Sequence, residues 1–286
     1  MERTVLGGSV PHEKRAHMAE ADAAFSGAIA QFYDRHFGAP LFGPYGEDIA
    51  RRLAGLSSGA VLEVAAGTGI VTAVLAQTLP AAVAITATDL NQPMLDFAAT
   101  KPGLDRVIWQ QADAMALPFP DSSFEAVICQ FGVMFFPDRP RAHAEARRIL
   151  KPSGRYIFNV WDSLEHNPVA EVVHRTVADL YPARPPGFVG RTPFGYHDAD
   201  VIAGDLKAAG FETCAINTVS TTWSASSPHD PAIAFCQGSP LRAEIEAVDS
   251  DGPTRATEAA TAAIVAYLGG RPPDFPMQAL VIEAIR

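Results

Sequence analysis

Glycines and an acid stand close together in one short stretch of the chain. The run 61–70 reads as an apolar strand that carries Glu63 near its end and breaks at Gly67 and Gly69 before a helix. Because glycine has no side chain, the backbone of such a turn can approach a ligand closely. The stretch therefore predicts a ligand-binding turn, although a glycine pair alone also fits a tight turn without a ligand.

A second acid follows the turn at an informative distance. Asp89 ends the next strand-like run, twenty residues after Gly69. An acid at this point of a strand–helix–strand unit can accept both ribose hydroxyls of a bound nucleoside. The spacing fits any adenosine cofactor, NAD included, but the dinucleotide fingerprint expects a third glycine where this chain has Thr72. The alternative for Asp89 is an N-cap of the helix that follows.

A third acid, Asp113, follows the third strand-like run. A carboxylate at this point can accept a hydrogen bond from the exocyclic amine of adenine, while a neighbouring backbone N–H meets a ring nitrogen. A solvent-exposed loop acid is the alternative. Taken with Asp89, this residue predicts an adenosine-binding site.

Alternating strands and helices are expected to position these residues. The strand-like runs are short and rich in Val, Ile and Ala, as in strands buried on both faces, and they cover 60–64, 82–88, 107–110, 124–129 and 155–160. Helices are predicted at 70–78, 92–99 and 140–150. The last of these should stop at the turn 151–154, which contains Pro and Gly. Such alternation predicts an α/β fold with a doubly wound, parallel sheet.

The flanking segments read as additions to this core. We expect a helix at 199–209 and two further strands at 213–222 and 278–285. The predicted division is an N-terminal helical cap at 1–56, with helices near 19–30 and 45–53, a core at 57–222 and 276–286, a Pro-rich, partly helical loop at 162–198, and a helical insertion at 223–275 with a helix at 256–268. Loops at the carboxyl edge of a doubly wound sheet carry ligands, so the three added segments are expected to form a lid there.

Composition narrows the classes of partner. The chain has 286 residues, with 22 Lys and Arg against 32 Asp and Glu, and a net charge of −10 disfavours nucleic acid or an anionic membrane as the main partner. Three scattered cysteines without a CxxC pair, and His12 and His17 at a spacing of five, predict neither disulfides nor a metal site. With no signal-like or membrane-spanning apolar run, we expect a cytoplasmic protein. The oligomeric state stays open.

These motifs together resemble the class I S-adenosylmethionine-dependent methyltransferases, and most closely the small-molecule group that includes the ubiquinone/menaquinone-type enzymes. The resemblance covers about residues 60–160 and rests on Glu63…Gly67-Thr68-Gly69, Asp89, Gln111-Ala112-Asp113-Ala114, Leu117-Pro118-Phe119…Ser123-Phe124 and Leu150-Lys151-Pro152-Ser153-Gly154. It departs from the family at Ala65, where glycine is usual.

The resemblance implies a seven-stranded, Rossmann-like sheet with an antiparallel last strand. It also implies S-adenosylmethionine as cofactor and in-line methyl transfer to a small organic acceptor. By position, the methionine end would be held by Glu63 and by the turn residues Ala65, Gly67, Thr68 and Gly69, with Tyr33 closing over the carboxylate. The adenosine would be bound by Asp89, Leu90, Met94, Asp113 and Ala114, and the sulfonium would lie beside Gln130 and Phe131.

Methyl transfer needs a general base only when the acceptor must lose a proton. His197 and His166, both in the predicted lid, are the candidates, and a surface or packing role is the alternative for each. Two other functions stay open at this point: a nucleotide-dependent oxidoreductase, and a non-catalytic protein that binds S-adenosylmethionine. Nicotinamide cofactor binding would favour the first, and methyl transfer to any acceptor would exclude the second.

Overall fold

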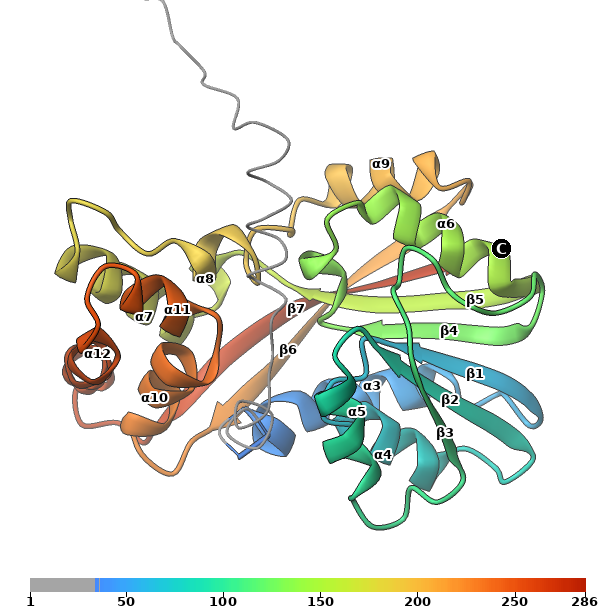
Figure 1. Cartoon of the computed structure of the whole chain (residues 1–286), viewed down its shortest axis with the longest axis horizontal. Coiled ribbons are helices and arrows are strands. Elements are labelled where there is room, and N and C mark those ends of the chain that lie inside the picture. The colour runs from blue at the N-terminus through green and yellow to red at the C-terminus, as the bar shows by residue number, and fades with distance from the viewer. Residues whose placement is uncertain (1–33, 36) are drawn as a thin grey trace, which may run out of the picture.

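The computed structural model describes residues 34–35 and 37–286 (Figure 1). Tyr33 and the helix expected near 19–30 lie outside these residues. One seven-stranded sheet has the order β3-β2-β1-β4-β5-β7-β6. Its strands are β1 (Gly59–Val64), β2 (Val83–Asp89), β3 (Val107–Gln111), β4 (Phe124–Gln130), β5 (Leu150–Trp161), β6 (Cys214–Ser224) and β7 (Asp274–Ile285).

Strand pairing confirms the doubly wound, mostly parallel sheet. β1 pairs in parallel with both β2 and β4, and the sheet extends in parallel to β3 on one side and to β5 on the other. β7 runs antiparallel between β5 and β6, which confirms the antiparallel last strand. The strand order reverses between β1 and β4, and open α/β sheets bind ligands outside such a switch point.

Helices cover both faces of the sheet (Figure 1). One face carries α3 (Gly43–Arg52), α4 (Ile70–Thr78) and α5 (Gln92–Ala99), and the other carries α6 (Arg139–Ile149) and α9 (Ala199–Ala208). α4 and α5 have the predicted bounds. α3 is preceded by a short π-helical turn, η1 (Gly38–Phe42), which brings aromatic side chains toward the sheet. The inner strands β1, β2 and β4 are mostly buried, as their Val- and Ile-rich sequences predicted, whereas the edge strands β3 and β6 stay largely half-buried or exposed.

One predicted turn is part of a strand. The sequence predicts a turn at 151–154 after the α6 helix, whereas β5 begins at Leu150 and runs through this stretch. The pairing with β4 shifts register between Phe124 and Ala126, and Ser153 has a positive φ of 64°. The Pro and Gly therefore mark an irregularity inside the strand, where such residues are tolerated.

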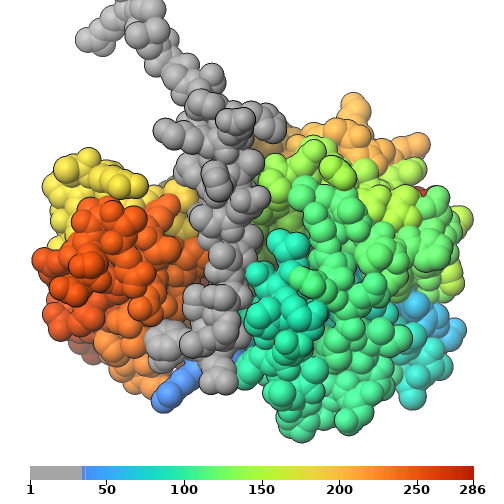
Figure 2. Space-filling model, in the orientation of Figure 1, coloured from blue at the N-terminus to red at the C-terminus, as the bar shows by residue number. Residues whose placement is uncertain are grey.

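The remaining helices gather beyond the end of the sheet formed by β6 and β7, as a lobe beside the core (Figures 1 and 2). This helical cluster consists of η3 (Leu164–His166), α7 (Pro168–Leu180), α8 (Phe188–Arg191), α10 (His229–Gly238), α11 (Leu241–Glu246) and α12 (Gly252–Leu268). α12 packs against both α7 and α10. The segments 162–198 and 223–275 therefore form one body. Its role as a lid stays a prediction.

The segment 162–198 is more helical than the sequence predicts. α7 alone has 13 residues. Of the prolines in this segment, Pro168 occupies the first turn of α7, where the missing N–H costs nothing, and the others follow Leu180. The high proline content of the whole segment therefore predicted a loop, although α7 contains proline only in its first turn.

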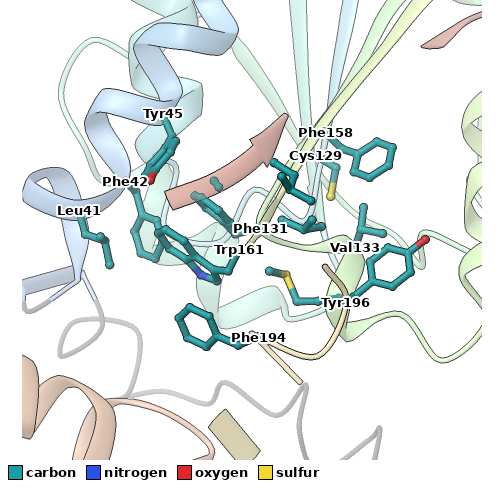
Figure 3. Packing of buried hydrophobic residues seen from close by; sticks show 14 of the residues in the cluster. Leu41, Phe42, Tyr45, Cys129, Phe131, Val133, Phe158, Trp161, Phe194 and Tyr196 are labelled. Carbon is teal, nitrogen blue, oxygen red and sulfur yellow. The ribbon is translucent and has the colours of Figure 1, made fainter. Parts of the chain in front are cut away.

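Aromatic side chains join the core to the helical cluster (Figure 3). Phe131, just after β4, stacks on Trp161 at the end of β5 with a centroid distance of 3.9 Å and an angle of 12°. Tyr45 meets both rings edge-on, at 5.1 and 5.4 Å, and Phe194 from the cluster stacks on Trp161 at 5.8 Å. Each such pair contributes about 0.5–1.5 kcal/mol beyond burial, so this contact fixes the cluster against the sheet.

Candidate active site

A cavity of about 430 Å³, here called the main cavity, lies at the carboxyl ends of β1, β2 and β4. Its volume falls within the range of small-molecule sites, about 300–1,000 Å³. Its lining includes most residues that the sequence analysis selected: Glu63, Ala65, Gly67, Thr68, Asp89, Leu90, Met94, Asp113, Ala114, Gln130 and Phe131. The strand ends thus bring together residues that are up to 68 positions apart in the sequence.

The turn after β1 has three residues with left-handed backbone conformation. Ala65, Gly67 and Gly69 have φ values of 55°, 54° and 75°. Gly69 does not line the main cavity, and a Cβ there would lie 3.0 Å from the Ala98 side chain and 3.1 Å from the Trp109 ring. Gly67 has open space around such a Cβ and lines the cavity. Gly67 therefore leaves room for a ligand, while Gly69 permits helix–strand packing.

Ala65 fits the turn because of a glycine on the neighbouring strand end. A left-handed conformation costs an L-residue roughly 1–2 kcal/mol. A Cβ at Gly132 would lie 2.6 Å from the Ala65 Cβ and 2.7 Å from the Cys129 sulfur. The methyl group that distinguishes Ala65 from the family's usual glycine therefore occupies space that Gly132 leaves free. The sequence showed Ala65 as a departure but gave no sign of this compensation.

Glu63 lies beneath the turn and is only 2% exposed. The hydroxyl of Thr72 donates to its carboxyl group at 2.5 Å. Burial raises the pKa of Glu63 to about 8, against the opposing effect of the Thr72 hydrogen bond, and nearby Asp89 raises it further. Glu63 is therefore mostly protonated at neutral pH. Thr72, which stands where a dinucleotide site has its third glycine, holds this acid.

Asp89 ties the turn to the start of α5. One carboxylate oxygen accepts from the backbone N–H of Gly67 at 2.9 Å, and the other accepts from that of Asn91 at 2.8 Å. Burial raises the pKa of Asp89, although these hydrogen bonds oppose the shift. The N-cap position of α5 belongs to Asn91. The N-cap alternative for Asp89 is therefore wrong, and the acid faces the cavity instead.

Asp113 and Ala114 line the cavity from the loop after β3. The Asp113 carboxylate accepts from the backbone N–H of Met115 at 2.8 Å, which holds the acid in place. The loop is fixed to β2, because the backbone N–H of Ala112 donates to the carbonyl of Asp89 at 3.0 Å. Asp113 therefore lies beside Asp89 on the same wall, as expected of residues at neighbouring strand ends.

Gln130 and Phe131 form the wall at the end of β4. The Gln130 amide donates to the carbonyl of Phe42 at 3.1 Å, whereas its buried Oε1 has no partner among the described residues. The buried Thr68 hydroxyl likewise has no hydrogen-bond partner among the described residues. Phe131 has a φ of 51°, and its N–H donates to the side chain of Asn159 at 2.9 Å. Buried polar atoms are nearly always satisfied, so these two fit a polar ligand in the cavity.

The charges of the wall suit a cationic ligand. Asp89 and Asp113 line the main cavity together with Glu63, which is mostly uncharged at neutral pH, and the described lining contains no Lys, Arg or His. S-adenosylmethionine carries a sulfonium and an ammonium group and offers a ribose diol and an adenine amine as donors. The site therefore fits this group in both charge and hydrogen bonding.

Sequence reasoning missed an aromatic part of the lining. Phe42 reaches the cavity from η1, and Phe135 and Phe136 reach it from the 3-10 turn η2 (Val133–Phe135) and the residue after it. The run Phe135-Phe136-Pro137, which begins five residues after the end of β4, was the available signal for two of these residues. Phe42 had no local signal, because it comes from a segment before the first strand.

Neither candidate base lines the main cavity. The Nδ1 of His197 lies 3.0 Å from the carbonyl of Phe194, which makes Nδ1 the protonated nitrogen and leaves Nε2 basic. The Nδ1 of His166 lies 3.0 Å from the Ser163 hydroxyl. Asp198, next to His197, caps α9 through the backbone N–H groups of Asp200 and Val201. A catalytic role for either histidine stays a prediction.

The described residues contain neither a metal-binding cluster nor a membrane-spanning helix. Within residues 34–35 and 37–286, no three His, Cys, Asp or Glu side chains are grouped so that they could hold a metal ion. Over the same residues, every helix is too short or too polar to span a membrane.

Known proteins are similar to part of this chain. Residues 62–158 match the family model described as a methyltransferase domain. The chain is 38% identical over 123 residues to a demethylmenaquinone methyltransferase of Deinococcus radiodurans, a match that covers 42% of this chain and 48% of that protein. It is 38% identical over 104 residues to a ubiquinone/menaquinone biosynthesis C-methyltransferase of Geobacter sulfurreducens, covering 35% and 41%. The matches thus span about half or less of the relatives' length.

A solved structure shares the fold over nearly the whole chain. The phosphoethanolamine N-methyltransferase 2 of Haemonchus contortus, solved in complex with S-adenosyl-L-methionine, superposes with a TM-score of 0.57 at 17% identity. The superposition covers 98% of this chain and 60% of that one. At this identity the likeness concerns the fold alone.

Proposed function

Because the chain carries a class I S-adenosylmethionine-dependent methyltransferase domain, we propose that it transfers the methyl group of S-adenosylmethionine to a small organic acceptor, giving S-adenosylhomocysteine. The observation that carries this proposal is the main cavity, which joins an acidic wall with Asp89 and Asp113 to an aromatic wall around Phe131. The first suits a cationic nucleoside, and the second suits an apolar acceptor.

Each wall has its own task in this proposal. Asp89 accepts the ribose hydroxyls, because its carboxylate keeps lone pairs beyond those used by Gly67 and Asn91. Asp113, with the backbone of Ala114, reads the adenine edge, and Leu90 and Met94 cover the rings.

The chain's contribution to the reaction is positioning and exclusion of water. When bound, S-adenosylmethionine supplies a methyl group activated by a positively charged sulfur. The Gln130 Oε1 and the Phe131 ring delimit the reacting end of the cavity. Fixing two reactants in line can supply about 7–11 kcal/mol of the barrier, and an apolar wall keeps competing water away.

A general base is needed only for an acceptor that must lose a proton. His197 serves an acceptor that must lose a proton if its Nε2 reaches the acceptor, and His166 is the second candidate.

We also propose that the chain acts in the cytoplasm. The acidic net charge of −10 supports a small-molecule acceptor in place of a nucleic acid.

Calorimetry with S-adenosylhomocysteine tests the proposal. Asp89→Ala is expected to weaken binding by about 1.5–3 kcal/mol, the scale of hydrogen bonds to a charged group. Asp96→Ala is the matched control, because Asp96 is an exposed acid on α5 outside the cavity lining, and it should bind as the wild type does.

The same titrations distinguish the other functions. If the wild type binds NAD but not S-adenosylhomocysteine, the oxidoreductase interpretation replaces this one. If it binds S-adenosylhomocysteine but methylates none of a broad panel of small acceptors, the chain is a binding protein. Wild-type affinity in Asp89→Ala would contradict the assignment of Asp89 to the ribose.

A further inference from the structure

A second cavity adjoins the main cavity on the side of the helical cluster. It has a volume of about 50 Å³ and shares Phe42, Phe131 and Phe135 with the lining of the main cavity. Phe188, Phe194 and Phe235 close it from the cluster. An acceptor that occupied both spaces would lie across the Phe131 ring, at the end of the main cavity where Gln130 and Phe131 stand.

The lining of this second cavity offers an occupant no charge and few hydrogen-bonding groups. None of its described lining residues is ionisable, and the side chains among them with a hydrogen-bonding N–H or O–H group are Trp161 and Ser239. The Ser239 hydroxyl donates to the carbonyl of Phe235 at 2.7 Å and accepts from the N–H of Leu241 at 3.2 Å. Burying an unpaired polar group in such a space costs several kcal/mol. The lining therefore selects an uncharged, apolar group.

The volume limits the size of that group. An engineered apolar cavity of about 150 Å³ holds a benzene molecule. At about 50 Å³, the second cavity admits a short alkyl group, or one edge of a single ring whose remainder lies in the main cavity. A fused ring pair or a long chain exceeds this volume.

The residues that set this limit are particular to this chain's added segments. Phe188, Phe194 and Phe235 lie in the helical cluster, outside residues 62–158 that match the methyltransferase family. The acceptors named for the relatives therefore say nothing about this space, and its own chemistry has to identify the occupant.

Resting on the function proposed above, we propose that the methyl acceptor is a small, uncharged molecule whose apolar end, no larger than one aromatic ring, enters the second cavity past Phe131. The Phe194 ring, which stacks on Trp161, sets the length limit. Phe194 is thus a specificity-determining residue, and replacing its ring by the alanine methyl group should enlarge the second cavity.

Four probes test this proposal on the full chain saturated with S-adenosylhomocysteine: toluene, naphthalene, benzoate and benzylammonium, each titrated by calorimetry. Toluene is expected to bind at least tenfold more tightly than the other three. In Phe194→Ala, naphthalene should bind at least tenfold more tightly than it binds the wild type. Phe119→Ala is the matched control, because Phe119 packs on Phe124 and lines neither cavity, and it should change each affinity less than twofold.

Several outcomes would overturn the proposal. Benzylammonium binding as tightly as toluene would make the pocket an aromatic cage for a cation, and equal affinity of the wild type for naphthalene would remove the size limit. Absence of toluene binding would contradict the claim that an apolar group enters the second cavity. Phe194→Leu replaces Phe194→Ala if the alanine variant does not fold. Because S-adenosylhomocysteine affinity is measured first, a failure of the proposed function is seen separately, and toluene binding to the cofactor-free chain then still tests the cavity.

Discussion

Glu63 is expected to make the folded chain less stable as the pH rises from about 5 to 8. Its carboxyl group is buried, and burial raises its pKa from about 4.5 to about 8. Over this interval the folded chain keeps a proton that the unfolded chain releases. The free energy of unfolding therefore falls with rising pH, and the stability present below the unfolded pKa is lost by the time the pH passes the folded pKa.

The size of the effect follows from one proton. A single proton changes the free energy of unfolding by about 1.4 kcal/mol per pH unit, which amounts to about 4 kcal/mol between pH 5 and 8. Glu63→Gln keeps an oxygen that can accept from the Thr72 hydroxyl but cannot ionise. Relative to the wild type, this variant should therefore gain up to about 4 kcal/mol over the same interval.

Urea unfolding of both proteins at several pH values measures this difference. His143 is buried with its pKa lowered to about 3, so it makes both proteins gain stability between pH 3 and 6.5, and its contribution cancels in the comparison. Glu258→Gln, which removes an exposed acid on α12, controls for the loss of one charge. A difference between wild type and Glu63→Gln that stays constant from pH 5 to 8 would refute a raised pKa at Glu63.

Two further predictions concern the turn and the candidate base. Gly132→Ala should destabilise the fold by about 1–3 kcal/mol, because the new Cβ would lie 2.6 Å from that of Ala65 and 2.7 Å from the Cys129 sulfur. Adding Ala65→Gly removes the first of these clashes and should restore part of the loss in urea unfolding. Equal destabilisation with and without Ala65→Gly would contradict the proposed contact. A base role for His197 predicts that His197→Ala lowers turnover about 10²-fold and leaves S-adenosylhomocysteine affinity unchanged. Normal turnover with an unchanged pH profile would leave His197 a structural residue.

Local signals explain why parts of the fold were predictable from the sequence. α4 begins after Gly69, whose φ of 75° ends the turn, and α5 begins with Pro93 in its first turn. Both helices have the predicted bounds because these residues act within a few positions of themselves. The acids Asp89 and Asp113 both line the main cavity, because parallel strands bring their carboxyl ends to one edge.

The remaining features depend on contacts between distant segments. In the sequence, Thr72 indicated only that the third glycine of a dinucleotide site is absent. No local pattern predicts that the Thr72 hydroxyl donates to Glu63 across the turn. Phe42 joins the cavity wall from η1, and its position depends on packing against Phe131 at 5.6 Å. The second cavity likewise needs Phe194 and Phe235 to line one space, and no periodicity relates two such positions.

Phe131 has a consequence for how the two substrates influence each other. Its ring borders both cavities, its backbone is held in a left-handed conformation by Asn159, and its face rests on Trp161. A ligand in one cavity that shifts the Phe131 ring changes the space open to a ligand in the other cavity. Coupling between two binding events is reciprocal, so the factor by which the cofactor changes acceptor affinity equals the factor by which the acceptor changes cofactor affinity. Phe131 is therefore the side chain through which occupants of the two cavities are expected to change each other's affinity.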